Sequence, residues 1–243
     1  MKLIEKYKSN NFDKRQKNLN LEYIIIHYTA MHSCQEALKF LCNEKNKVSS
    51  HYLISKKGQI YYLVDTEKRA WHAGESYWKG ETDINSCSIG IEIDNSGHMN
   101  NFEPYNNIQI NSLHKLLSFL KSEFKILEQN ILGHSDIAPF RKLDPGEKFP
   151  WDFLSKFGIV YMPKKNKNIS FNENILENID FLEDSIKMLD FIGYDLRNVE
   201  PNSTKFKMLI KAYQMHYVQN NVTGNLDNLT FEIIKNQFKD MLT

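Results

Sequence analysis

The sequence has few cysteines, and their positions do not predict a disulfide framework. Cys34, Cys42 and Cys87 make an odd count and lack the paired spacing of a structural metal site. Cys34 and Cys42 fall on one predicted helix, eight residues and therefore about 12 Å apart, whereas the bridged Cα atoms of a disulfide lie within about 7 Å. We therefore expect free thiols, as in a reducing compartment.

The chain also lacks long apolar runs and an excess of charge of either sign. No stretch approaches the roughly 18 apolar residues of a membrane span, and residues 1–20 hold no apolar run long enough for a signal peptide. The net charge of +1, with both signs mixed along the chain, excludes the basic footprint of a nucleic-acid-binding protein. The sequence thus predicts a cytoplasmic protein with no integral membrane segment, no nucleic-acid partner and no obligate protein partner. A periplasmic or cell-wall location is the alternative.

The apolar pattern predicts an α/β core. With 243 residues, of which 41% are hydrophobic, the chain can bury one good core and a smaller second one. Residues 21–29 contain the unbroken apolar run of a buried central strand. Residues 88–93 alternate as a strand does, and residues 107–128 have the apolar spacing of an amphipathic helix that covers a sheet.

A change in composition divides the chain. Residues 162–174 contain proline, lysines and asparagines with little periodicity, which is typical of a linker. Helical apolar spacing returns in three later segments, residues 175–191, 204–218 and 228–242. We predict one domain over residues 1–161 and a small three-helix domain over residues 175–243.

The loop of residues 133–146 (GHSDIAPFRKLDPG) holds a histidine, a lysine and an aspartate between two glycines, as reactive sites often do. His134 and Asp144 are side chains that Zn²⁺ accepts as ligands, and the residues between them let a loop bring both to one ion. His27, at the end of the buried strand of residues 21–29, is the third candidate. Two histidines, one carboxylate and an open position for water make the ligand set of a catalytic zinc. The alternative is that His27 is a hydrogen-bonded core residue and His134 an ordinary loop histidine.

Three more segments lie between these histidines and carry a family resemblance. They are residues 49–64 (SSHYLISKKGQIYYLV), 69–76 (RAWHAGES) and 87–93 (CSIGIEI). With the two histidine segments, they make residues 21–158 resemble the zinc-dependent N-acetylmuramoyl-L-alanine amidases. The resemblance implies a central mixed β-sheet flanked by helices, with zinc bound by His27, His134 and Asp144.

The same resemblance implies a reaction for the domain of residues 1–161. This reaction is cleavage of the amide that joins the lactyl group of N-acetylmuramic acid to the first L-alanine of the stem peptide. The substrate would be a soluble 1,6-anhydromuropeptide or polymeric peptidoglycan. A non-catalytic peptidoglycan-recognition protein is the alternative function.

Glu92 is the candidate general base. Period two in residues 88–93 places Glu92 and Gly90 on the face opposite the isoleucines, and Gly90 would leave room for a ligand to approach. A carboxylate near zinc-activated water can take its proton and later deliver it to the leaving amine. Asp94 is the competing carboxylate, and a solvated glutamate on an exposed strand is the other interpretation.

Lys142 and Arg141 supply positive charge next to Asp144. If this segment is extended, Lys142 points to the same side as Asp144, where its ammonium would stabilise the developing oxyanion. Arg141 could bind the carboxylates of the stem peptide through its planar guanidinium. The alternative is that each of the two is an ordinary solvated residue of the loop.

The RAWHAGES segment predicts a wall for the substrate. Trp71, His72 and Ala73 suit a sugar or lactyl group that packs on an aromatic face beside a closely approaching backbone. The alternative makes Trp71 a core residue with His72 as its hydrogen-bonded neighbour. His51 is predicted to support a metal ligand, because metal-bound histidines need a partner on their other nitrogen.

The C-terminal helices resemble a peptidoglycan-binding domain of the three-helix type. The resemblance rests on the segments FIGYD (residues 191–195), KAYQMHY (211–217) and TGNLDNLT (223–230). A helical cap that only stabilises the enzyme is the alternative. His216 has no motif around it, and we expect it to be structural or exposed.

Overall fold

The computed structural model describes residues 1–16, 20–164 and 179–242. Its strands are β1 (Leu3–Ile4), β2 (Phe12–Lys14), β3 (Tyr23–Tyr28), β4 (Tyr52–Ile54), β5 (Ile60–Tyr62), β6 (Lys68–Ala70), β7 (Ser88–Ile93) and β8 (Ile131–Gly133). Its α-helices are α1 (Cys34–Leu41), α2 (Ile84–Cys87), α3 (Asn107–Phe124), α4 (His134–Ile137), α5 (Trp151–Ser155), α6 (Ile179–Ile192), α7 (Thr204–Tyr217) and α8 (Asn228–Asp240). Within this described part, no helix is long and apolar enough to cross a membrane.

The main sheet is mixed, with strand order β1-β5-β4-β7-β3-β8. β3 is parallel to both of its neighbours, β7 and β8, and β4 is antiparallel to β5. A separate two-stranded sheet joins β2 and β6. The α/β fold with a central sheet flanked by helices is confirmed, and the apolar composition of β3 follows from its position between two strands.

The two faces of β3 belong to different cores. Ile24 and Ile26 pack with the isoleucines of β7 and the leucines of α3. Tyr23 and Ile25 point the other way and join an apolar cluster that includes Ile137 of α4 and the C-terminal helices. Alternation along the strand thus buries both faces, and it places His27 on the same face as Tyr23 and Ile25.

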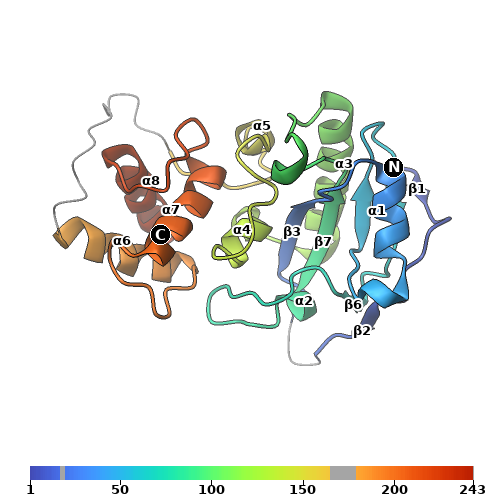
Figure 1. The fold of residues 1–243 in the computed structure, drawn as a ribbon, viewed down its shortest axis with the longest axis horizontal. Coiled ribbons are helices and arrows are strands. Elements are labelled where there is room, and N and C mark those ends of the chain that lie inside the picture. The colour runs from blue at the N-terminus through green and yellow to red at the C-terminus, as the bar shows by residue number, and fades with distance from the viewer. Residues whose placement is uncertain (17–19, 165–178, 243) are drawn as a thin grey trace.

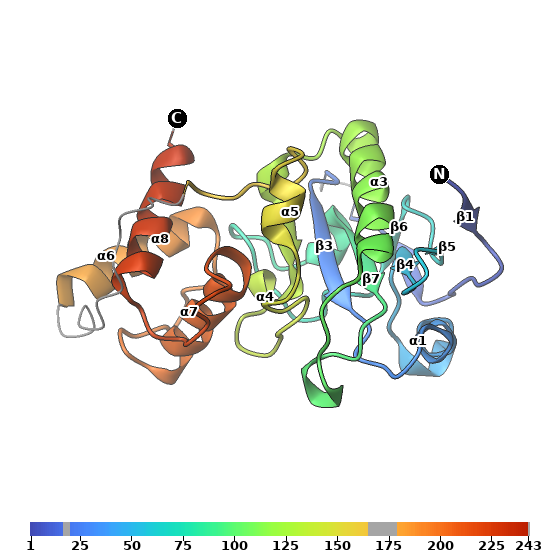
Figure 2. The ribbon, with the colours of Figure 1, turned by 90° about the horizontal axis from the view of Figure 1, so that it is seen from above.

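The helices form layers on either side of this sheet. Figure 1 shows α6, α7 and α8 together at one end of the molecule, with α4 between them and the sheet. Seen from above, α3 and α5 lie along one side, and the two termini lie at opposite ends (Figure 2). The predicted helix of residues 107–128 ends at Phe124, because Lys125 adopts a left-handed conformation with φ of 54°.

The C-terminal segments form the three predicted helices, but these share a core with the first part of the chain. One apolar cluster contains residues from both parts, among them Ile25, Leu132, Ile137, Leu189, Leu209, Ile210 and Ile234. Of the predicted linker, residues 165–174 lie outside the described residues, as do residues 175–178 of the first predicted helical segment. The helices are therefore packed on the sheet domain rather than attached to it by a linker alone.

The three cysteines are free thiols, as expected.

Candidate metal centre and active site

The three predicted ligands come from neighbouring parts of the sheet. His27 lies near the end of β3, His134 begins α4 directly after β8, and Asp144 lies in the loop between α4 and α5. Because β3 and β8 are adjacent and parallel, their carboxyl ends bring the two histidines together. The side chains of all three residues are buried.

The ligand atoms form a close triangle. Nδ1 of His27 lies 2.9 Å from Nδ1 of His134 and 3.1 Å from Oδ2 of Asp144, and the remaining side measures 3.0 Å. Ligands of a tetrahedral zinc lie roughly 3.3 Å apart, given bonds of about 2.0–2.1 Å. Two nitrogens and one carboxylate oxygen at this spacing form a group that could hold a metal ion.

The other ring nitrogens are held by fixed partners, which determine the tautomers. His134 Nε2 lies 2.9 Å from the carbonyl oxygen of Ala73, and a carbonyl can only accept, so the nitrogen must donate. His27 Nε2 lies 3.1 Å from Nδ1 of His72. His72 Nε2 lies 3.3 Å from the hydroxyl of Ser88, which itself donates to the carbonyl of Ile84. If each proton points along this chain, both Nδ1 atoms face the triangle as lone pairs, as metal binding requires.

The charges in the cluster suit metal binding. Burial, together with the neighbouring His134, lowers the pKa of His27 to about 4, so the ring is neutral. Burial alone would raise the pKa of Asp144, but hydrogen bonds and attraction from His134 and His27 outweigh it and lower that pKa below its usual range. The cluster therefore offers a neutral imidazole from His27 and an ionised carboxylate from Asp144, which are the protonation states of metal ligands.

Glu92 lies directly beside His27 in the sheet. The two residues are register partners on β7 and β3, and the isoleucines of β7 face the opposite side, as predicted. Glu92 Oε2 is buried and has no hydrogen-bond partner among the described residues. Burial, strengthened by the negative charge of Asp144, raises the pKa of Glu92 well above 4.5. A carboxylate whose pKa is raised in this way is suited to accept a proton and to return it.

Asp94 does not compete for this role. It follows β7, and its Oδ2 accepts a hydrogen bond from the backbone nitrogen of Lys56 at 3.1 Å. Asp94 does not line the cavity that contains the three ligands.

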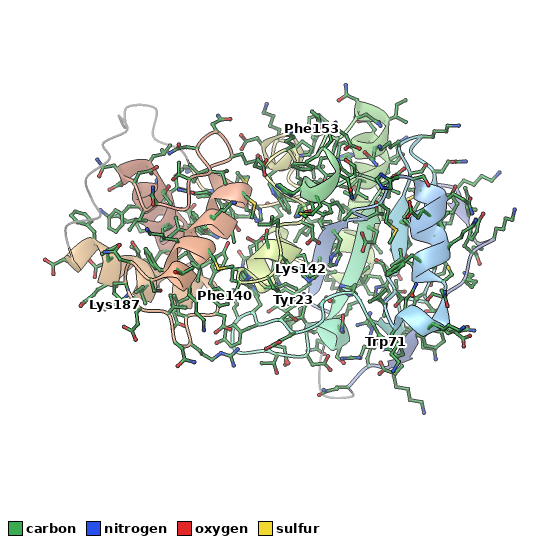
Figure 3. The ribbon with its side chains drawn as sticks, in the orientation of Figure 1. Tyr23, Trp71, Phe140, Lys142, Phe153 and Lys187 are labelled. Atoms are coloured by element: carbon green, nitrogen blue, oxygen red, sulfur yellow. The ribbon has the colours of Figure 1, made fainter. Side chains whose placement is uncertain are left out.

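The ligand triangle opens into a cavity of about 210 Å³. Its wall includes Glu92, Lys142, Trp71 and His72, so the cavity brings these predicted site residues together. Figure 3 shows Lys142 between α4 and the sheet. Sequence analysis missed the wall supplied by β3, α1 and the loop between them, which includes Tyr28, Met31, Ala37, Phe40 and Leu41. The apolar side of this cavity can pack against carbon atoms of a substrate.

The room beside Gly90 is not free for a ligand. A Cβ added at Gly90 would lie within 2.7 Å of three ring atoms of His72. The glycine therefore makes space for the histidine that supports His27, and the prediction of a ligand at this point of the strand was wrong. His72 itself is buried, and burial, together with the neighbouring His27 and His51, lowers its pKa well below 6.5.

Ala73 and Arg141 support the loop of residues 133–146, which contains His134 and Asp144 and is called the ligand loop below. Ala73 is fully buried, and its carbonyl accepts hydrogen bonds from His134 and Arg141. Arg141 Nε also donates to the carbonyl of Glu75 at 2.8 Å. Arg141 lines a different cavity from the one that contains the ligands. That both residues contact substrate stays a prediction, but these hydrogen bonds fix the backbone next to His134.

Arg15 was missed because its partners are remote in the sequence. Its guanidinium donates to the carbonyls of Asn85, Ser86 and Ser88 at 2.9 Å each, where β7 begins. It also lies 3.0 Å from Nε2 of His51, whose Nδ1 accepts from the backbone nitrogen of Gly90. Burial lowers the pKa of Arg15 to about 10. His51 thus supports the strand of Glu92, and its ring also contacts the ring of His72, the partner of His27, with 5.7 Å between centroids.

The fold and the site together define an α/β protein with a buried His-His-Asp cluster beside an unpartnered glutamate. Residues 17–147 match the family model described as N-acetylmuramoyl-L-alanine amidase. The chain is 33% identical to AmiD of Escherichia coli strain K12, over 85% of this chain and 78% of that protein. It is also 33% identical to the 1,6-anhydro-N-acetylmuramyl-L-alanine amidase AmpD of Haemophilus influenzae, over 59% and 86% of the two chains.

Solved structures agree over nearly the whole chain. AmiD of E. coli, in complex with anhydro-N-acetylmuramic acid-L-Ala-D-γ-Glu-L-Lys, superposes with a TM-score of 0.79 at 30% identity and covers 93% of both chains. AmpDh3 of Pseudomonas aeruginosa superposes with a TM-score of 0.80 at 29% identity and covers 100% of both. The chain belongs to the N-acetylmuramoyl-L-alanine amidase family. It is therefore a hydrolase of the amide bond between N-acetylmuramic acid and L-alanine, and the non-catalytic alternative is set aside.

Proposed function

We propose that hydrolysis depends on a zinc ion held by His27, His134 and Asp144. The support is the triangle of two Nδ1 atoms and one carboxylate oxygen, 2.9 to 3.1 Å apart, at the wall of a cavity. Two histidines and a carboxylate form the donor set of catalytic zinc sites. When bound there, zinc would supply a water of lowered pKa and polarise the scissile carbonyl.

Glu92 moves the proton in this proposal. Its unpartnered Oε2 lies on the same face of the sheet as His27, so it can accept a proton from a water in the cavity. Because its pKa is raised, the protonated form of Glu92 persists after it has taken the proton. It can then donate that proton to the leaving amine of L-alanine. One residue therefore acts first as a base and then as an acid.

Lys142 stabilises the negative charge that develops on the carbonyl oxygen. It lines the cavity with Glu92 and Asp144, and its positive charge acts to lower the pKa values of both Glu92 and His27. An ammonium that is fixed before the reaction stabilises the transition state without reorganisation.

The segment of residues 71–73 and Arg141 position the substrate in this proposal. Trp71 and His72 line the cavity directly. Ala73 and Arg141 act on the position of the substrate through the backbone next to His134. We assign an anhydromuramoyl peptide as substrate, because AmiD and AmpDh3 have each been solved in complex with an anhydromuramic peptide. Such fragments arise when peptidoglycan is recycled or remodelled.

The chain is divided in this proposal into a catalytic domain (residues 1–161), a linker (162–174) and a helical domain (175–243) that binds peptidoglycan. A second binding site would raise the effective concentration of the enzyme on a polymeric wall. Removing the helical domain would uncover the apolar cluster it shares with β3 and α4, so its function has to be tested in the whole chain. Co-sedimentation of a Glu92→Gln chain with purified sacculi measures the binding without degrading the polymer.

The test of the reaction is mass spectrometry of products from soluble anhydromuropeptide and from sacculi, in parallel, with metal-free protein and zinc-loaded protein. Release of a peptide that begins at L-alanine, only after zinc is restored, is the expected result. Full activity of the metal-free protein would refute the zinc dependence. The substrate from which peptide is released faster shows whether the enzyme acts mainly on a soluble fragment or on the polymer. The cytoplasmic location stays a prediction, which cell fractionation tests.

A further inference from the structure

Asp136 is a fully buried carboxylate two residues after His134. Its Oδ2 accepts hydrogen bonds from the backbone nitrogen of Gly133 and from Nδ1 of His216, each at 2.7 Å. Its Oδ1 accepts one from the hydroxyl of Tyr194, also at 2.7 Å. A carboxylate removed from water is costly unless such donors surround it. These three bonds therefore determine where Asp136 lies.

Two of the three donors belong to the C-terminal helices. Tyr194 follows α6, and His216 lies in the last turn of α7. They are 58 and 80 residues from Asp136 along the chain. α4 has only four residues, too few to hold an orientation by its own hydrogen bonds. The orientation of α4, which begins with His134, therefore depends on the C-terminal helices.

Residues at the end of α7 also hold the other end of the ligand loop. Gln219, just beyond α7, donates to the carbonyls of Glu147 and Phe149 at 2.7 and 2.6 Å. These carbonyls follow Asp144 just beyond the end of that loop. The ring of His216 also stacks on Trp151 at the start of α5, with 3.7 Å between centroids. Contacts from the end of α7 thus lie on both sides of the segment that contains His134 and Asp144.

A further contact reaches the middle of the loop. The ammonium of Lys205, in the first turn of α7, lies 5.4 Å from the ring centre of Phe140. Figure 3 shows Phe140 on the side of the loop toward α7 and Lys142 on the side toward the sheet. One side of the loop therefore faces the helices and the other faces the cavity.

We propose that the C-terminal helices position the metal-ligand loop, and that Tyr194, His216 and Gln219 are positioning residues for the reaction. Tyr194 and His216 act through Asp136 on His134, and Gln219 acts on the backbone after Asp144. The proposal rests on the function of His134 and Asp144 as zinc ligands. It gives the helices a function in hydrolysis that does not depend on whether they bind peptidoglycan.

The test compares Tyr194→Phe with a matched control, Tyr213→Phe. Both tyrosines are fully buried in the C-terminal part, and Tyr213 donates its hydroxyl bond to Gln237 of α8 at 2.8 Å. Each variant removes one buried hydroxyl and leaves the ring. The measurements are zinc affinity by chelator competition, thermal unfolding, and kcat and KM on soluble anhydromuropeptide.

We expect Tyr194→Phe to weaken zinc affinity about tenfold, the lower end of the effect of groups that orient metal ligands, and to lower kcat more than KM changes. Tyr213→Phe should lower the unfolding temperature by a similar amount and keep the zinc affinity of the unaltered chain. If both variants keep that affinity and kcat, or both lose them equally, the positioning function is refuted. A native chain that binds no zinc would overturn this proposal together with the zinc dependence of the reaction.

A milder pair of variants covers the case in which Tyr194→Phe does not fold. Gln219→Ala removes the two bonds after Asp144, whereas Asn236→Ala removes a comparable amide bond, to the carbonyl of Lys164. Gln219→Ala should weaken zinc affinity and lower kcat, with Asn236→Ala unchanged in both. Equal zinc affinity in the two variants would contradict the proposal.

Discussion

His27 and Glu92 are register partners on the adjacent parallel strands β3 and β7. Side chains opposite each other in a sheet point to the same face, so the proposed metal ligand and the proposed proton carrier are held side by side by backbone hydrogen bonds. Neither residue needs a flexible loop to reach the other. Half of the proposed site is thus built into the sheet, and its other two residues, His134 and Asp144, lie at the start of α4 and in the loop after it.

Replacing Asp144 should remove the metal. Asp144→Ala takes away one of three ligands and leaves two histidine nitrogens 2.9 Å apart. We expect zinc affinity to fall more than about 100-fold, the upper end of what loss of a supporting residue causes. Metal analysis after gel filtration measures this. Asp190→Ala, on the exposed side of α6, is the control, and stoichiometric zinc in Asp144→Ala would show that Asp144 is not a ligand.

Replacing Glu92 should separate metal binding from turnover. Glu92→Gln keeps the shape of the side chain but cannot take a proton, so we expect kcat to fall about 10²- to 10⁴-fold with bound zinc unchanged. Product release is followed by mass spectrometry and zinc by metal analysis. Glu123→Gln, exposed on α3, should behave as the unaltered chain. A fully active Glu92→Gln chain would disprove the assignment of the base.

Activity should fall in acid because of Glu92. Burial, together with the charge of Asp144, raises the pKa of Glu92 well above 4.5. The base works only when ionised, so kcat/KM should decline as pH falls through this raised pKa, at a higher pH than for an ordinary glutamate. A profile of kcat/KM against pH shows the decline. The same decline persisting in the residual activity of Glu92→Gln would assign it to another group.

Replacing Lys142 should lower kcat with little effect on the metal. Lys142→Ala removes a cation from the cavity wall, and the loss of one oxyanion-stabilising group costs about 10²- to 10³-fold in kcat. Steady-state kinetics on soluble anhydromuropeptide, with zinc content measured in parallel, tests this. Lys115→Ala, exposed on α3, is the control. An increase in KM alone would instead assign Lys142 to ground-state binding.

The whole chain should unfold in one transition. Ile25 of β3 and Ile210 of α7 are both fully buried in the cluster that joins the two parts, so Ile25→Ala and Ile210→Ala should each destabilise the whole by about 2–5 kcal/mol. Calorimetry should show, for either variant, a single unfolding transition at a lower temperature than that of the unaltered chain. Leu127→Ala, which removes an exposed side chain, should change little. Two separate transitions would show that the parts fold independently.

The local parts of the fold could be predicted from the sequence because they depend on local periodicity. The alternation of residues 88–93 predicted a strand with Glu92 opposite the isoleucines, and the structure confirms both. The end of α3 at Phe124 could not be predicted, since the apolar spacing continues and only the left-handed backbone of Lys125 ends the helix. The space beside Gly90 was assigned to a ligand because the ring of His72, 18 residues earlier in the chain, fills it only after folding.

The sequence by itself determined the family and therefore the reaction, because the segments of residues 21–158 resemble the amidases in type and order, and that resemblance predicts a His-His-Asp set and a nearby glutamate. Tertiary structure decided what surrounds that set. The tautomers of the histidines depend on Ala73 and His72, and the orientation of α4 depends on Tyr194 and His216. Hydrogen bonds between buried groups so far apart in the chain leave no periodic pattern, because only the packing of the C-terminal helices on the sheet brings donor and acceptor together.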